Sequence, residues 1–212
     1  MVNAENLNLF MMCEQLNCAA LSELDPKYHI RNCRQEELDI WAAFPFDDAE
    51  AAKVNYAAML DYYDKVYKAR SELFFRSCLF VCDDQDKPLA TGFLWPAYGC
   101  LTTIHWLKTL KDYEGQGIGR ALLSVLLHDA REAAYPIYLH THPACFRAIK
   151  LYSDFGFALL TDEKYGYRYN DLSQGLALLK QYMPEACYNR LQFAKAPPSF
   201  METVKMTVYE QF

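Results

Sequence analysis

The sequence predicts an α+β fold: a mixed, mostly antiparallel sheet with flanking helices and a central βαβ unit. The chain has 212 residues and is 52% hydrophobic and 15% aromatic, which is enough apolar material for a sizeable core. Three short apolar segments follow one another between residues 77 and 110, and their short connections favour antiparallel pairing. A helical pattern then separates them from a further strand at 137–141, which predicts the βαβ unit.

Composition excludes several classes of function. With 21 Lys+Arg against 27 Asp+Glu, the formal charge is −6, which argues against broad binding to nucleic acid or to anionic membranes. The first fifteen residues lack the basic start of a signal peptide, and no apolar run approaches the roughly 18 residues of a membrane span. The eight cysteines show no CxxC pair or zinc-finger spacing. We therefore expect a cytoplasmic protein with reduced thiols.

In the first 70 residues the sequence pattern predicts one strand and two helices. Residues 1–26 form an N-terminal leader to which we assign no element. A short strand is expected at Tyr28–Arg31 and a helix at Glu36–Phe44. The Ala-rich segment from Asp47 to about Arg70 has a helical pattern, with Asp47 as its expected N-cap.

The middle of the chain predicts three consecutive strands and then the crossover. The strands are Ser77–Cys82, Leu89–Tyr98 and Leu101–Leu110, in meander order. A helix follows Gly119 and is expected to end near Tyr135-Pro136, before the strand Ile137–Thr141.

A second helix begins at His142-Pro143, with proline at its first position, and stops at Gly156. A closing hairpin is expected from Phe157–Leu160 and Tyr165–Tyr169, and residues 171–212 form a mainly helical extension. The main domain is accordingly placed at 27–170.

The most informative segment is Lys111–Arg120, a turn between a strand and a helix with glycine at three alternating positions: Gly115, Gly117 and Gly119. Such a turn lets backbone N–H groups converge on a phosphate at the positive end of a helix dipole. A GxGxxG dinucleotide fingerprint is excluded because Arg120 stands where Gly or Ala is needed. A P-loop is excluded because no GKS or GKT follows.

Two motifs resemble the GNAT superfamily of N-acetyltransferases. Glu114–Gly119 matches Gln/Arg-x-x-Gly-x-Gly/Ala, and Cys145–Tyr152 followed by Gly156-Phe157 matches Asn-x-x-Ala-x-x-Leu-Tyr with Gly-Phe. The order of elements agrees from about Tyr28 to Tyr169. The resemblance covers neither the leader nor the last forty-odd residues.

The resemblance implies that acetyl-CoA, the acyl-donor cosubstrate, lies in a gap between the strands at 101–110 and 137–141. It implies pantetheine contacts along three residues of the first strand: Leu107, Lys108 and Thr109. It implies pyrophosphate contacts with the backbone of the turn: Gly115, Gln116, Gly117, Ile118, Gly119 and Arg120. Glu114 departs from the usual Gln or Arg, and Arg120, Arg147 and Lys150 are cations that could offset its charge.

The resemblance also implies that Tyr152 is the general acid that protonates the leaving thiolate. The identity of the general base that deprotonates the amine is left open. A glutamate common in relatives falls on Thr103, which cannot serve, whereas another family position falls on His140, and His105 shares a strand face with Thr103. A neutral imidazole suits a base near neutral pH. A water relay, or no dedicated base, is the remaining possibility.

Cys145 replaces the usual Asn of the second motif, so a cofactor contact there is weakened. It lies in the first turn of a helix, where a thiol is activated, so a Cys–His acyl-enzyme route is a minor alternative. A metal site formed by His140, His142 and Cys145 is another, but His142 is better explained as the residue that precedes the helix. We expect no metal.

These observations predict an acetyl-CoA-dependent N-acyltransferase acting on a small-molecule or peptide amine. The alternatives are a catalytically weak acyl-CoA sensor or scaffold and a zinc-dependent hydrolase. Acidic and tyrosine side chains of the helical segment that covers the acceptor side in the family are a weak pointer to a cationic amine: Asp47, Asp48, Asp61, Asp64, Tyr56, Tyr62 and Tyr63. Three roles stay open for the extension at 171–212: to complete the acceptor pocket, to cap a sheet edge or to form a homodimer.

Overall fold

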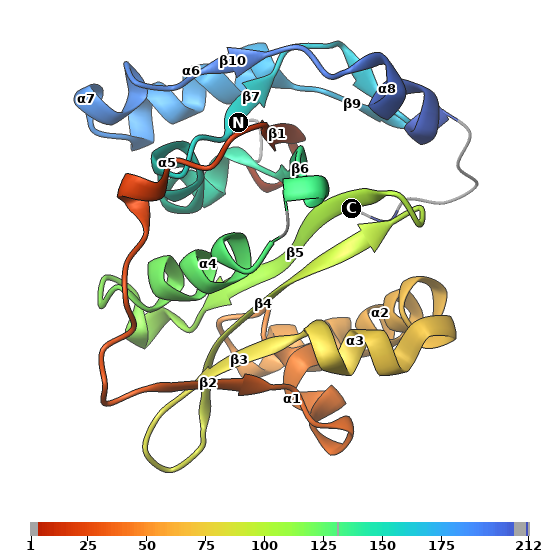
Figure 1. Cartoon of the computed structure of the whole chain (residues 1–212), viewed down its shortest axis with the longest axis vertical. Helices are drawn as coiled ribbons and strands as arrows, with labels where there is room; N and C mark the ends of the chain where they lie inside the picture. Colours follow the sequence, from red (N-terminus) through yellow and green to blue (C-terminus); the bar gives the residue numbers. More distant parts are fainter. Residues whose placement is uncertain (1–3, 131, 206–210, 212) are drawn as a thin grey trace. The chain divides into compact units, whose positions relative to one another are not determined.

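A computed structural model describes residues 4–130, 132–205 and 211, so the end of the expected extension lies outside the described residues except for Gln211. The chain divides into two compact units (Figure 1). Unit 1 comprises residues 1–20, 96–103 and 130–212, and unit 2 comprises residues 21–95 and 104–129. No helix among the described residues has the length and apolar character needed to cross a bilayer.

The described residues form ten strands, eight of them in one sheet ordered β10-β7-β1-β6-β5-β4-β3-β2. The strands are β1 Leu9–Cys13, β2 His29–Asn32, β3 Leu79–Cys82, β4 Pro88–Ala97, β5 Leu101–Thr109, β6 Ile137–Thr141, β7 Ala158–Leu160, β8 Lys164–Tyr165, β9 Arg168–Tyr169 and β10 Phe193–Ala194. The α-helices are α1 Leu38–Ala43, α2 Ala49–Val66, α3 Ser71–Ser77, α4 Ile118–His128, α5 Phe146–Asp154, α6 Leu172–Tyr182, α7 Glu185–Tyr188 and α8 Pro198–Lys205. The 3-10 helices are η1 Ala4–Asn6, η2 Cys18–Ala20, η3 Gln35–Glu37, η4 Lys68–Arg70, η5 Lys111–Tyr113, η6 Glu132–Ala134 and η7 Pro143–Cys145.

Unit 2 contains β2, β3 and most of β4, and its strand pairing is antiparallel, with Ile30 opposite Val81 and Val81 opposite Ala90. The amphipathic helix α4 buries Ile118 and Leu122 against Val81, which explains its apolar spacing. The predicted meander of three strands is confirmed by the neighbouring positions of β3, β4 and β5.

Unit 1 is built around β1, which pairs antiparallel with β6 and with β7, while β10 pairs parallel with β7. The first residues of β5 pair parallel with β6, with Thr102 opposite Ile137. This parallel pair across α4 confirms the predicted βαβ unit within a mostly antiparallel sheet. Helix α6 comes so close to β1 that a side chain at Gly175 would lie 2.7 Å from a methyl group of Leu9.

The expected leader contains the strand β1, to which the sequence analysis assigned no element. All five residues of Leu9–Cys13 are buried, and β1 lies between β6 and β7. Its sequence, LFMMC, has no alternation of polar and apolar residues because both of its faces are covered. The expected helical extension likewise contains a strand, β10, at the edge of the same sheet.

Three local predictions are wrong. The hairpin of 157–160 with 165–169 does not form, because β7 pairs with β1 and β10 while β8 and β9 pair with each other. Helix α2 is capped by Asp48, whose carboxylate accepts a hydrogen bond from the Ala51 N–H, and not by Asp47. Helix α4 ends at His128, well before Pro136.

Candidate functional site

The glycine turn follows β5 and η5 in unit 2 and leads into α4. Gly115 and Gly117 have φ angles of +78° and +81°, a left-handed conformation that L side chains rarely adopt. A Cβ atom at either position would meet no protein atom within 4 Å. The backbone of the turn is therefore open on the side where these side chains would project.

Helix α4 begins at Ile118, directly after the left-handed Gly117 at its N-cap. The first N–H groups of a helix have no carbonyl partner within the helix and carry the positive end of its dipole. Gly119 allows close packing, because a Cβ there would lie 3.1 Å from the hydroxyl oxygen of Thr109. The Gln116 side chain is held by Tyr28, whose hydroxyl donates a 2.7 Å hydrogen bond to its Oε1. The turn can bind an anion through main-chain amides.

The strand that precedes the turn is distorted at Trp106, which has a φ of +52° in the middle of β5. Positive φ is an outlier for a bulky residue and occurs preferentially at functional sites. Leu107, Lys108 and Thr109, the predicted pantetheine contacts, come directly after it. The side chain of Lys108 forms a 2.6 Å ion pair with Asp47 of unit 2.

His105, one of the two candidate bases, is buried next to this distortion. Its Nδ1 lies 2.5 Å from the hydroxyl of Tyr67, which accepts a 3.0 Å hydrogen bond from the indole N–H of Trp106. Its Nε2 is buried and has no hydrogen-bond partner among the described residues. Burial lowers the pKa of His105 to about 3, so the imidazole is neutral near pH 7.

His140, the other candidate base, lies in β6 of unit 1, and its neighbours determine its tautomer. Asp171 accepts hydrogen bonds from the backbone N–H and the side-chain amide of Asn8. The amide oxygen of Asn8 therefore faces His140, at 2.9 Å from Nε2, and Nε2 must carry the proton. The basic nitrogen is Nδ1. Burial, followed by the charges of Arg168 and His142, lowers the pKa of His140 to about 3.

Tyr152, the predicted general acid, lies in α5 of unit 1 and is buried. Burial raises the pKa of its hydroxyl, and the charge of Cys145 adds to the effect. The hydroxyl therefore holds its proton at neutral pH, as a proton donor must.

Cys145 is half-buried and N-caps α5, and its Sγ lies 3.4 Å from Nε2 of His142. His142 caps η7, as expected of the residue before the helix. The alternative metal site is not assembled, because His140 faces Asn8 whereas His142 faces Cys145. No structural observation supports the zinc-hydrolase hypothesis.

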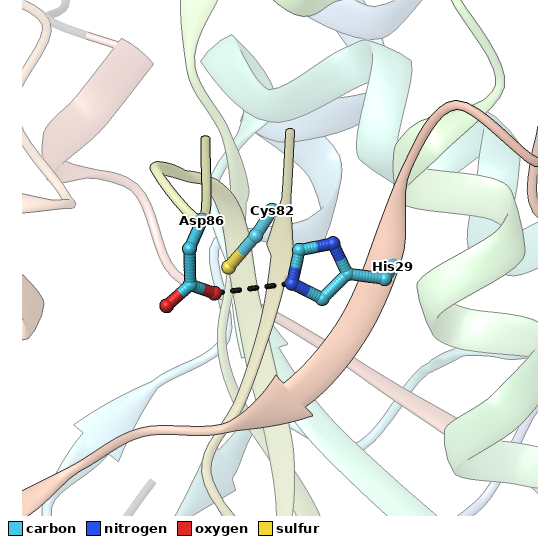
Figure 2. Close-up of side chains that lie close together, drawn as sticks. All are labelled: His29, Cys82 and Asp86. Carbon is cyan, nitrogen blue, oxygen red and sulfur yellow. Dashed lines mark hydrogen bonds and ion pairs between the residues drawn. The ribbon is translucent and has the colours of Figure 1, made fainter. Parts of the chain in front are cut away.

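A different group of metal-ligand type occurs in unit 2, formed by His29, Cys82 and Asp86 (Figure 2). His29 and Cys82 are opposite each other in β2 and β3, and Nε2 of His29 lies 3.0 Å from Oδ1 of Asp86. The same oxygen accepts a 2.6 Å hydrogen bond from Arg31, and the other oxygen accepts one of 2.7 Å from Arg34. Two guanidinium groups already neutralise Asp86 and would repel a cation, so the group is an ion-pair network.

The four aspartates of α2 and of the segment before it also have partners. Asp61 and Asp64 pair with Lys65 and Lys68 one turn later, at 2.5 and 2.7 Å. Asp47 pairs with Lys108 and Asp48 caps α2, as described above. Because each carboxylate is engaged, this surface gives little support to a cationic acceptor.

The predicted site residues fall into two groups. Unit 2 holds the glycine turn, Leu107–Thr109 and His105, while unit 1 holds His140, Cys145 and Tyr152. Of the neighbouring cations, Lys150 forms a 2.7 Å ion pair with Asp154. The partners of the two histidines could not be predicted from the sequence, because Tyr67 and Asn8 lie 38 and 132 residues away and no local pattern connects them.

Comparison with known proteins identifies the family to which the chain belongs. A family model described as "Acetyltransferase (GNAT) family" matches residues 35–157, more than half of the chain. No curated protein matches the sequence.

Two solved structures resemble the fold. A GNAT-family acetyltransferase from Colwellia psychrerythraea has 18% identity and a TM-score of 0.52, and the match covers 73% of this chain and 53% of that one. A GCN5-related N-acetyltransferase-like protein from Streptococcus suis 89/1591 has 12% identity and a TM-score of 0.51, with 73% and 58% covered. The chain therefore matches somewhat more than half of the length of each.

Proposed function

This chain belongs to the acetyltransferase (GNAT) family, and we propose that it transfers an acyl group from acetyl-CoA to an amine by direct attack in a ternary complex. The observation that carries the proposal is the glycine turn between β5 and α4. It combines two left-handed glycines, open space where their side chains would be and the N-terminus of a helix. A pyrophosphate bound by main-chain amides requires these features.

In this proposal the backbone of Gly115–Arg120 binds the pyrophosphate, and Leu107–Thr109 bind the pantetheine arm. The distortion at Trp106 supports the second assignment, because it changes the direction of the N–H groups that follow in β5. Those groups can also polarise the thioester carbonyl. Cys145 is assigned to the cofactor site on the family motif alone.

We propose Tyr152 as the acid that protonates the CoA thiolate. The base stays open between His140, His105 and water. A pKa of about 3 makes either imidazole a weak base, which favours an amine that reaches the enzyme already neutral or loses its proton to water. A cytoplasmic location and a small-molecule or peptide acceptor stay predictions from the sequence.

The experiment is to incubate the purified chain with acetyl-CoA and a panel of amines, and to follow release of the CoA thiol and binding of CoA separately. Turnover with at least one amine supports the transferase. CoA binding without turnover for any amine favours the acyl-CoA sensor or scaffold, and absence of CoA binding contradicts both.

A further inference from the structure

We propose that Cys145 is an acylatable thiol, activated by His142, that accepts an acyl group from an acyl thioester. The inference rests on the proposed function for its natural donor, acetyl-CoA. It concerns a covalent step that the direct attack of an amine in a ternary complex does not include.

The first observation is the thiol–imidazole contact. Sγ of Cys145 lies 3.4 Å from Nε2 of His142, within hydrogen-bond distance for sulfur. Burial lowers the pKa of His142, so the imidazole is neutral near pH 7. In the tautomer that carries its proton on Nδ1, Nε2 has a lone pair that can accept the thiol proton. A nucleophile within hydrogen-bond reach of such a base is the usual arrangement in covalent acyl transfer.

The second observation concerns the far side of the imidazole. Nδ1 of His142 is buried and has no hydrogen-bond partner among the described residues. The negative charge of Glu5, in η1, raises the pKa of His142 and opposes the effect of burial. The charge of Glu5 thus favours the imidazolium that forms when His142 takes a proton.

The third observation is a comparison with other cysteines of the chain. Cys187 is half-buried too, but the group that contacts its Sγ is the guanidinium of Arg190, at 3.7 Å, and not an imidazole. Cys13 and Cys82 are buried, and burial raises the pKa of each thiol to about 11. The exposed Cys18 and Cys100 contact a backbone carbonyl and a threonine hydroxyl. Cys145 combines partial exposure with an imidazole contact.

The proposed step is a transthioesterification, in which the acyl group moves from the sulfur of CoA to the sulfur of Cys145. His142 takes the proton of Cys145, and the thiolate attacks the carbonyl carbon of the donor. The new C–S bond forms as the C–S bond to CoA breaks, and the CoA thiolate leaves with the proton held by His142. No oxidant or reductant is required, and the product is an S-acyl cysteine.

The test is to incubate the full chain with acetyl-CoA, quench with acid, and map the acyl group by peptide mass spectrometry. We expect one acyl group on the peptide that contains Cys145, removable by hydroxylamine at neutral pH as a thioester is. The variant Cys145→Ser should lose this labile label, and His142→Gln should slow its formation by about 100-fold. Cys100→Ser, which removes an exposed thiol without a histidine neighbour, should label like the wild type.

A parallel measurement of CoA binding separates the two proposals. If CoA binds and Cys145 stays unmodified by acetyl-CoA, the inference is wrong while the proposed function stands. If CoA does not bind, the small thioester S-acetyl-N-acetylcysteamine replaces it. If this donor labels Cys145, the acylatable thiol is supported even though the proposed function has failed. If it does not label Cys145, the inference is overturned.

Discussion

At the scale of single residues, His105 and His140 illustrate how burial determines protonation. Each imidazole is enclosed, and each has one nitrogen beside a partner distant in sequence, Tyr67 or Asn8. Removing the charged imidazolium from water costs free energy, so both side chains stay neutral well below pH 6.5. Their residue types could be read from the sequence, but their environment depends on elements that come together only in the fold.

This burial predicts a pH dependence of stability. The pKa of each histidine is about 3 in the folded chain against an ordinary value of 6.5, so the unfolded chain binds the proton first as the pH falls. The stabilisation is complete above pH 6.5 and is lost below it, by about 1.4 kcal/mol per pH unit and per histidine. Urea unfolding at pH 7, 6 and 5 should show a smaller loss for His105→Gln or His140→Gln than for the wild type.

His128→Gln is the control, since that side chain is 72% exposed. We expect it to keep the wild-type pH dependence. Equal slopes for the wild type and both buried-site variants would show that these imidazoles are not held neutral by the fold.

The substitution Tyr152→Phe tests the proposed role of the Tyr152 hydroxyl as the general acid. Removing a positioned proton donor should lower turnover by about 100-fold or more, with little change in CoA affinity, because the ring and its packing in α5 remain. Tyr138→Phe removes another buried tyrosine hydroxyl of unit 1 and should retain most activity. Full activity of the Tyr152 variant would eliminate the acid role.

At the scale of elements, the sequence predicts best where a pattern is local. The strand Ile137–Thr141 is predicted with its observed bounds, and the glycine-rich segment forms the predicted turn between a strand and a helix. The prediction is poorest where pairing is distant. The apolar run of β1 is compatible with several structures, and its strand conformation depends on β6, more than 120 residues later. The failed hairpin has the same cause, since β7 pairs with β1.

The contribution of the N-cap residue of α2 to stability can be tested by substitution. Asp48 accepts the Ala51 N–H at 2.7 Å, so Asp48→Ala should lower the free energy of unfolding by about 1 kcal/mol. The neighbouring Asp47→Ala removes only a partly exposed ion pair with Lys108 and should cost about 0.5 kcal/mol or less. Chemical denaturation of both variants measures the difference, and a larger loss for Asp47→Ala would contradict the assignment.

At the scale of the whole molecule, the formal charge of −6 raises the question of how an acidic chain would bind the polyanion CoA, as we propose. The structure offers main-chain amides at the glycine turn, which need no basic side chain. Many carboxylates are also engaged locally, in the pairs of α2 and in the network around Asp86. The net charge of the chain is therefore compatible with the proposed binding of CoA by main-chain amides.

The central claim is that the glycine turn binds acetyl-CoA, and Gly117 and Gly99 offer a matched pair to test it. Both have left-handed φ angles, +81° and +78°, and a Cβ at either would meet no atom within 4 Å. Alanine at either position should therefore cost a similar 1–2 kcal/mol of stability, as a rough estimate. Only Gly117 lies in the turn.

The measurement is calorimetric titration of CoA into the wild type, Gly117→Ala and Gly99→Ala, each verified as folded. We predict that Gly117→Ala weakens CoA binding by about tenfold or more, because the methyl group occupies the space of the phosphate, while Gly99→Ala binds like the wild type. Equal CoA affinity for all three proteins would contradict the account.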